Sequence, residues 1–413
     1  MRSGSRALFY AYCLYAVLSL TSMAPMNIGA GLLLLAFILT TPSAAQLRNE
    51  TRNLLGDLAT RRLLLASLFL VAACLASWVH LAIDPVVHAG QSARLEPTDA
   101  LKLWYLIWPF VLALGWGRLS PHERVQVFRC WLWVFFLISW IGVQQFFTGW
   151  PRHQGNPSLP GYNHPVLFLG HHLSVASVWI FPFFVALDWM ISPENRQALR
   201  VPRGFWPALF AANAFVLFFL YSRTLWIALP LGLVLWGLLR LSKRWSIGLV
   251  LLLLAAGGTA YFQPAVQQRL HDSLGRTDRY QLWAADLALF RERPLFGTGF
   301  KKTSDTVTYY LQEKNPGQTQ FFVGHAHNIY LEMLTSTGVV GLAAFLVWIL
   351  FALLATRSGA RVATLATPVA VRLAWLVFLI NGLTQVNFWE GKVIHQLMWI
   401  TGWTLTWRSK PTL

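Results

Sequence analysis

Long apolar runs recur along the whole chain, and they constrain the fold more than any other feature. The 413 residues are 56% hydrophobic and only 12% charged. Several windows reach or approach the roughly 18 to 20 apolar residues that cross a hydrocarbon core about 30 Å thick, for example those around 205-220 and 373-389. Because the backbone inside a bilayer must satisfy its own hydrogen bonds, these runs predict helices. The sequence therefore predicts an all-α polytopic membrane protein.

The apolar runs also predict the topology. A coarse reading of hydropathy gives about twelve spans. They lie near residues 7-23, 25-41, 63-83, 101-117, 130-148, 166-190, 205-222, 224-239, 245-262, 328-355, 373-389 and 393-407. If the N-terminus is cytoplasmic, every inside segment carries Arg or Lys, from Arg2 and Arg6 at the start to Arg408 and Lys410 at the end. The positive-inside rule therefore predicts that both termini are cytoplasmic.

One sizeable polar segment interrupts the spans. It divides the chain into spans one to nine (1-262), a loop subdomain (263-327) and spans ten to twelve (328-413). Long loops that lack structure of their own are uncommon in compact proteins. Within the loop, 280-YQLWAADLALFRERP-294 has apolar residues at helical spacing and ends at a proline. We expect a loop with amphipathic helices between spans nine and ten on the outer side of the membrane, this one lying on the outer surface of the bilayer.

The formal net charge of +17 reflects topology more than a polyanion-binding surface. The positive charge is dispersed over short cytoplasmic turns, which argues against a nucleic-acid partner and fits anionic lipid head groups. Basic residues on the predicted outer side are not explained in this way. They gather between residues 263 and 324, at Arg269, Arg276, Arg279, Arg291, Arg293, Lys301, Lys302 and Lys314.

Three arginines are candidates for binding an anion. Arg223 stands between two apolar runs on the predicted outer side, where an arginine must snorkel, pair or face a polar cavity. It is either an ordinary helix-end anchor or an anion ligand, and its side of the membrane favours the second. Arg276 and Arg279 are three residues apart, hence on one face of a helix. They form either a solvated ion-pair cluster with neighbouring aspartates or a clamp for phosphate oxygens, which guanidinium groups suit.

Two histidines open the tenth predicted span, in 324-GHAHNIYLEMLTSTGVVGLAAFL-346. His325 and His327 could bind zinc as a pair, but a catalytic zinc site needs three protein ligands and no HExxH motif completes the set, so we expect no metal. A histidine at a helix mouth is often only a hydrogen-bonded terminus. At the water boundary its unperturbed pKa of about 6.5 also suits a general base.

The same span carries further polar and small residues. Glu332 lies roughly one and a half turns beyond His327, so it is either buried with a partner or lines a cavity. Gly338 and Gly341 are three apart, which predicts close packing with neighbouring spans.

Cysteine usage predicts no covalent or metal framework. Cys13, Cys74 and Cys130 lie far apart in the sequence with no CxxC spacing. Neither a disulfide framework nor a thiolate metal site is therefore indicated.

Four motifs occur in an order that resembles a known family. The run 327-HN-328, nine residues, Gly338, two residues and Gly341 is similar to the HN-x9-G-x-x-G pattern of the bacterial O-antigen ligase family. Upstream, 279-RYQLW-283 and 293-RPLFGTGF-300 resemble the R-x3-W and PL-x-G-x-G segments of O-antigen ligases and polymerases, and 222-SRTLW-226 resembles their serine-arginine opening. Together these motifs cover roughly residues 205 to 345.

The resemblance implies a GT-C-type membrane glycosyltransferase of the Gram-negative inner membrane with a periplasmic active site. Such a ligase moves O-antigen polysaccharide from undecaprenyl pyrophosphate to a sugar hydroxyl of lipid A-core, completing lipopolysaccharide, with no metal or other cofactor. The predicted catalytic residues are His327 as the general base of an inverting transfer, and Arg223 and Arg279 as the pyrophosphate clamp. The predicted substrate-binding residues are Arg276, His325, Asn328 and Glu332.

Other functions remain open from the sequence. An O-antigen polymerase would use the same donor but extend a second lipid-linked glycan, and a protein O-oligosaccharyltransferase would use a protein acceptor. A lipid-linked glycan transporter would explain a cationic cavity without needing His327. Transporters often show internal repeats and spans broken at the midplane, and no clear repeat is present.

Overall fold

The computed structural model describes residues 3–41, 43–157, 159–271, 278–316, 324–356 and 365–406. Over these ranges the chain is mostly helical, and its two named strands, β1 (Val87–His88) and β2 (Gln91–Ser92), pair as one short antiparallel hairpin. The predicted substrate-binding residue Arg276 falls between 271 and 278, outside the described residues.

The helices follow one another along the chain in an order that matches the predicted spans. They are α1 (Ser3–Leu18), α2 (Met23–Leu39), α3 (Ala44–Leu55), α4 (Leu58–Ile83), α5 (Pro97–Leu101), η1 (Lys102–Leu106), α6 (Trp108–Gly117), α7 (Pro121–Thr148), α8 (His172–Val178), α9 (Ile180–Ile191), α10 (Pro193–Leu199), α11 (Phe205–Phe219), α12 (Arg223–Arg240), α13 (Lys243–Tyr261), α14 (Pro264–His271), α15 (Asp278–Glu292), α16 (Thr303–Lys314), α17 (Ile329–Ala355), α18 (Pro368–Asn381), η2 (Gly382–Thr384) and α19 (Gly391–Leu405).

The multi-pass helical architecture is confirmed, although the count of twelve spans stays a prediction. Among the described residues, seven helical stretches are long and apolar enough to cross a membrane, or eight if α2 and α3, bent by 117°, are one span. The seven are Leu58–Ile83, Pro97–Gly117, Pro121–Thr148, His172–Ile191, Arg223–Arg240, Lys243–Tyr261 and Ile329–Ala355. Shorter apolar helices occupy Arg6–Leu18, Phe205–Phe219 and Pro368–Thr384.

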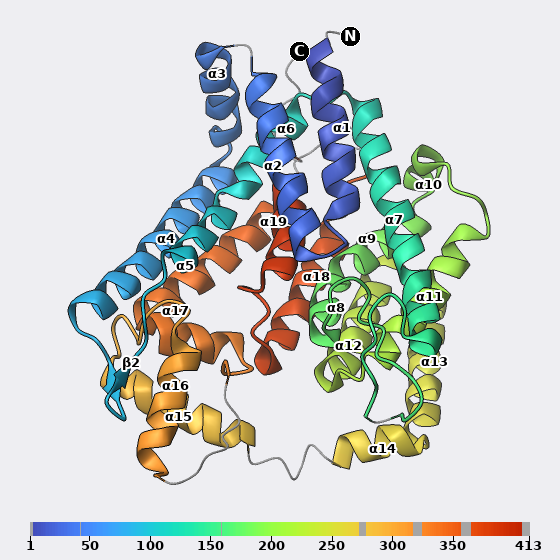
Figure 1. The fold of residues 1–413 in the computed structure, drawn as a ribbon. Coiled ribbons are helices and arrows are strands. Elements are labelled where there is room, and N and C mark those ends of the chain that lie inside the picture. The colour runs from blue at the N-terminus through green and yellow to red at the C-terminus, as the bar shows by residue number, and fades with distance from the viewer. Residues whose placement is uncertain are drawn as a thin grey trace.

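The start of α1 and the polar subdomain lie at opposite ends of the molecule (Figure 1). The start of α1 lies near the top of the view, whereas α14, α15 and α16 lie at the bottom.

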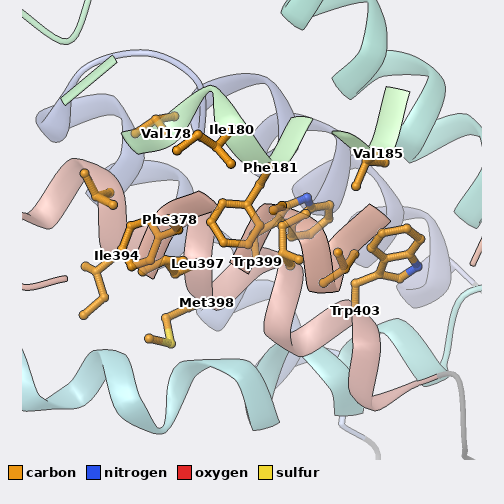
Figure 2. Close-up of a cluster of buried hydrophobic side chains, with 14 of the residues drawn as sticks. Val178, Ile180, Phe181, Val185, Phe378, Ile394, Leu397, Met398, Trp399 and Trp403 are labelled. Atoms are coloured by element: carbon orange, nitrogen blue, oxygen red, sulfur yellow. The ribbon is translucent and has the colours of Figure 1, made fainter. Parts of the chain in front are cut away.

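A tryptophan-rich core surrounds α19. Every residue from Val393 to Leu405 is buried, the polar His395 and Gln396 included. Figure 2 shows Leu397, Trp399 and Trp403 of α19 facing side chains of α8, α9 and α18. Aromatic rings in this core meet mostly edge to face, for example Trp399 with Trp116 at 5.7 Å between centroids, the geometry that ring quadrupoles favour.

A second, smaller core lies outside the spans. Leu282, Ala285 and Leu289 of α15 pack with residues of α16, the end of α4 and the 86-93 hairpin segment. The predicted helix at 280-294 is thus present, but its apolar face is buried against protein rather than laid on a bilayer, because the hairpin and α16 cover it. The sequence assigned this subdomain only to 263-327, and the hairpin after α4 belongs to it as well.

Ion pairs account for several of the outer basic residues. Arg293 pairs with Asp84, and Lys302, only 5% exposed at its side chain, contacts Asp99 at 2.8 Å. His88 lies 3.1 Å from Glu292 and 3.1 Å from Glu313, which joins the hairpin to α15 and α16. These pairs fasten the subdomain to the end of the membrane helices.

The tenth predicted span is broken at Gly338. Its backbone there has φ 66° and ψ −168°, a region that is essentially restricted to glycine. Backbone groups freed by the break bond to the 294-299 segment: Thr298 and Gly299 N–H donate to Thr335 and Ser336 carbonyls at 2.9 and 3.0 Å. In return, Val339 N–H donates to the Pro294 carbonyl at 2.9 Å.

This break changes the interpretation of the two glycines. A Cβ on Gly338 would lie 2.2 Å from the Leu295 carbonyl oxygen, so the close neighbour is the loop after α15 and not another span. A Cβ on Gly341 would lie 1.9 Å from Thr337 Oγ1, within α17 itself. At Gly338 the restriction thus comes from the 294-299 loop, while α4 packs on the same part of α17 through the bond from Ser77 to the Ser336 carbonyl, and close packing of spans at Gly341 stays a prediction. The PL-x-G-x-G segment packs against the first glycine of the G-x-x-G motif. We call this contact between the 294-299 loop and the break at Gly338 the joint.

Candidate active site

The His-Asn pair forms the turn that starts α17. Asn328 is the N-cap, and its Oδ1 accepts from the N–H groups of Tyr330 and Leu331 at 3.0 and 3.1 Å. Asparagine suits this position because its side chain satisfies backbone donors that lack a partner inside the helix. His327, immediately before the cap, has φ 48° in the left-handed region, which turns the chain sharply at the helix mouth.

Two side chains hold the residue between the histidines. Ala326 N–H donates to Glu332 Oε2 at 3.2 Å, and the Ala326 carbonyl accepts from Trp283 Nε1 at 2.7 Å. Glu332 is 8% exposed, so of the two readings of this residue the structure supports burial with a partner. The Trp of the R-x3-W motif and the Glu of α17 thus fix the position of His325 and His327.

The same helix brings an arginine to the histidines. Arg279 and Trp283 are four residues apart on α15, hence on one face. With Trp283 bonded to Ala326, Arg279 is half-buried and close enough to His327 to affect its pKa. The R-x3-W spacing therefore has a physical reason, because one helix turn separates the anchor from the guanidinium.

The imidazole of His327 is neutral at physiological pH. Its pKa is lowered from 6.5 to about 3, mainly by burial and in smaller part by the neighbouring His325, Arg279 and His171. The rings of His325 and His327 are 4.3 Å apart between centroids. A neutral imidazole can accept a proton, and an anion bound beside these cationic groups would raise its pKa and strengthen it as a base.

A loop between η2 and α19 forms the facing wall. Burial lowers the pKa of His171. The charges of Glu390, which raises this pKa, and of Lys392, which lowers it, act on the His171 ring together with His325, so these three residues lie near it. Ser174 donates a hydrogen bond to Glu390. His171 comes from the start of α8, so this wall joins segments more than two hundred residues apart in sequence.

Arg223 is placed at the other end of that loop. It is the first residue of α12 and half-buried. Its neighbour Ser222 accepts from Gln385 Nε2 at 3.4 Å, and Thr224 is hydrogen-bonded to Thr384. The serine-arginine opening is thus tied to the start of the 385-390 loop, and Glu390 at its far end lies beside His171.

Two ionisable residues for which the sequence predicted no role in the site also border it. Asp286 lies seven residues after Arg279 on α15 and is fully buried. Burial, together with the negative charge of Glu332, raises its pKa to about 8. The spacing of seven residues, about two helix turns, from Arg279 was the sequence feature that could have indicated a place for Asp286 near the site. Lys301, after α15, donates to the Trp389 carbonyl at 3.4 Å, and nothing in its local sequence predicted this.

No group of three or more His, Cys, Asp or Glu side chains arranged to hold a metal occurs among the described residues. The fold and the site define a multi-pass helical membrane protein with a neutral imidazole beside a guanidinium at the mouth of a span. Residues 208–346, roughly a third of the chain, match the family model described as O-antigen ligase. No curated protein matches the chain. The matched segment contains Arg223, Arg279, His327 and Gly338.

Proposed function

We propose that the protein is an O-antigen ligase that transfers O-antigen polysaccharide from undecaprenyl pyrophosphate to a sugar hydroxyl of lipid A-core. The observation that carries the proposal is the anchoring of Arg279 and His327 to one another through the Trp283–Ala326 bond, in a segment that matches the O-antigen ligase family. A lipid-linked pyrophosphate explains why guanidinium groups would gather at the end of membrane helices. A hydroxyl acceptor explains why a neutral imidazole would stand beside them.

In the proposed reaction, His327 accepts the proton of the acceptor hydroxyl as its oxygen attacks the anomeric carbon of the donor. The bond from that carbon to the pyrophosphate oxygen breaks with inversion, and undecaprenyl pyrophosphate leaves. Arg279 and Arg223 stabilise the charge that develops on the leaving group, so they act most strongly in the transition state. No metal is required for this step. We place the site on the periplasmic side of the inner membrane because the positive-inside rule puts both termini in the cytoplasm.

The decisive experiment is transfer by the purified protein. Lipid-linked O-antigen would be supplied with lipid A-core, with a second lipid-linked glycan, or with a protein acceptor, each with and without chelator. Capped lipid A-core formed in the presence of chelator is the expected result. Extension of the second lipid-linked glycan alone would identify a polymerase instead, and donor movement without any transfer would identify a transporter.

Arg223→Lys separates a bidentate clamp from simple charge. Lysine keeps the positive charge but lacks the planar fork that binds two phosphate oxygens. We expect transfer to fall well below the wild-type rate in Arg223→Lys. Full transfer in this variant would reduce the role of Arg223 to electrostatics.

A further inference from the structure

A cavity of about 430 Å³ lies between α2 and the α5-η1-α6 stretch. We call it the α2-η1 groove. Its volume is within the range of small-molecule sites. It is lined by Met23, Asn27, Ala30, Gly31, Leu34, Leu101, Lys102, Trp104, Tyr105 and Trp108.

The lining residues give the groove a direction. Those on α2 recur at intervals of three or four, hence along one helix face, over about 16 Å from Met23 to Leu34. Leu34 and Leu101, which line it, are 40% and 68% exposed, as are other apolar residues of the outer face of α2, so the groove opens where a bilayer would lie. Lys102 lies at the end nearest the polar subdomain, because Asp99, 3.8 Å from its Nζ, also pairs with Lys302 at 2.8 Å. The groove thus has a cationic end and an apolar body.

Three lysines gather at the cationic end, and the acids beside them are shared, since Lys302 contacts both Asp99 and Glu96, the latter at 3.9 Å. The Asp99 carboxylate contacts two lysines: Lys302 Nζ lies 2.8 Å from it and Lys102 Nζ lies 3.8 Å from it. Lys301 adds a third. Burial, together with the positive charge of Lys102, lowers the pKa of Lys301 to about 8. An anionic group bound here would relieve this repulsion.

The same end is connected to the candidate active site. Lys301 donates a hydrogen bond to the Trp389 carbonyl. It also lies close enough to Glu332 for the negative charge of that carboxylate to raise the pKa of Lys301. Glu332 in turn holds Ala326, between the two histidines. A lipid head group at Lys102 and Lys301 would therefore lie beside the loop that carries His327, next to Glu332 and Trp389.

We infer that the α2-η1 groove seats an acyl chain of the acceptor glycolipid, with a phosphate of that lipid on Lys102 and Lys301. The inference rests on the proposed function, which gives the donor pyrophosphate to Arg223 and Arg279 and leaves a second lipid to be placed. A single-chain groove whose polar end bears lysines suits an acylated, phosphorylated lipid, since lysine binds phosphate as a point charge.

The test uses Gly31→Phe, with Gly258→Phe on α13 as the matched control. A Cβ at either glycine meets no atom within 4 Å, so both replacements add a ring at an exposed helical position, but only Gly31 lines the groove. We expect Gly31→Phe to raise the KM for lipid A-core about tenfold, with the KM for the lipid-linked donor unchanged. Gly258→Phe should match the wild type. An unchanged acceptor KM in Gly31→Phe overturns the inference.

Photolabelling tests occupancy without requiring transfer. Lipid A-core with a diazirine in an acyl chain should label peptides covering residues 23–34 or 101–108, and removal of its phosphates or Lys102→Gln should weaken that labelling several-fold. Labelling of these peptides by diazirine-undecaprenyl pyrophosphate instead, or complete competition by phosphatidylglycerol, overturns the inference. If the groove is labelled but the protein transfers nothing, the proposed ligase function is wrong and the lipid site is retained. If transfer is normal but the groove is not labelled, the lipid site is wrong and the ligase function is retained.

Discussion

Replacing Gly338 by alanine tests the joint that holds the candidate site together. At φ 66° and ψ −168°, a non-glycine residue costs about 1–3 kcal/mol. The new Cβ would also lie 2.2 Å from the Leu295 oxygen and 2.6 Å from the Phe296 nitrogen. Both are backbone atoms, so relief requires moving the loop, and such overpacking costs about 1–3 kcal/mol more. The sum predicts a loss of roughly 2–6 kcal/mol.

The consequence for activity follows from the hydrogen bonds across the break. Moving the 294-299 loop weakens its bonds to Thr335 and Ser336, and shifts the first turns of α17 that carry Asn328 and His327. A displacement of about 1 Å at a reacting group can cost about a hundredfold in rate. We therefore expect Gly338→Ala to lose most transfer activity even well below its melting temperature.

Thermal unfolding followed by intrinsic tryptophan fluorescence in detergent measures the first effect, and the purified transfer assay measures the second. Gly258→Ala is the control, because its Cβ would meet no atom within 4 Å and its backbone is an ordinary helix. That variant should unfold at or slightly above the wild-type temperature. If the Gly338→Ala protein were as stable and as active as this control, the claim that the joint at Gly338 holds the candidate site in place would be refuted.

Three further predictions concern the site and the packing of the spans. Trp283→Phe removes the donor to the buried Ala326 carbonyl, so kcat should fall about 10- to 100-fold with little change in KM, and a normal kcat would show that this bond does not position the loop. Because the pKa of His327 is lowered to about 3, the imidazole is neutral in the free enzyme down to about pH 4, so kcat/KM should show no acid limb near 6.5; a limb there would contradict the burial of this ring. Cys13 of α1 and Cys130 of α7 lie close together where the two helices pack, so mild oxidation should protect both from maleimide together, and independent labelling would contradict this helix pairing.

The hydropathy and the residue spacing of short stretches of sequence were enough to predict the helices and the candidate residues. Hydropathy located a helix in each expected span, since an apolar run of this length has few other ways to satisfy its backbone. The spacing of 279-RYQLW-283 and 327-HN-328 marked Arg279 and His327 because these residue types suit pyrophosphate and proton transfer. These inferences needed only neighbours in the sequence.

Contacts between distant segments could not be obtained in this way. The joint at Gly338 depends on a loop forty residues upstream, and in the sequence its glycine spacing was indistinguishable from helix packing. His171 reaches the site only because α8 packs beside α19, and Cys13 meets Cys130 only because α1 packs on α7. Such pairings follow from the three-dimensional arrangement of helices, which single-sequence periodicity does not encode.

The most direct test of the account is the single-turnover transfer rate of His327→Asn with saturating donor and lipid A-core. Asparagine tolerates the left-handed backbone at this position, so the loop is retained while the base is lost. General-base catalysis is typically worth about 10² to 10⁴-fold. The account predicts a loss of this size in His327→Asn and a smaller loss in His325→Asn. A near-wild-type rate in His327→Asn, or a larger loss in His325→Asn, would contradict the assignment of the base.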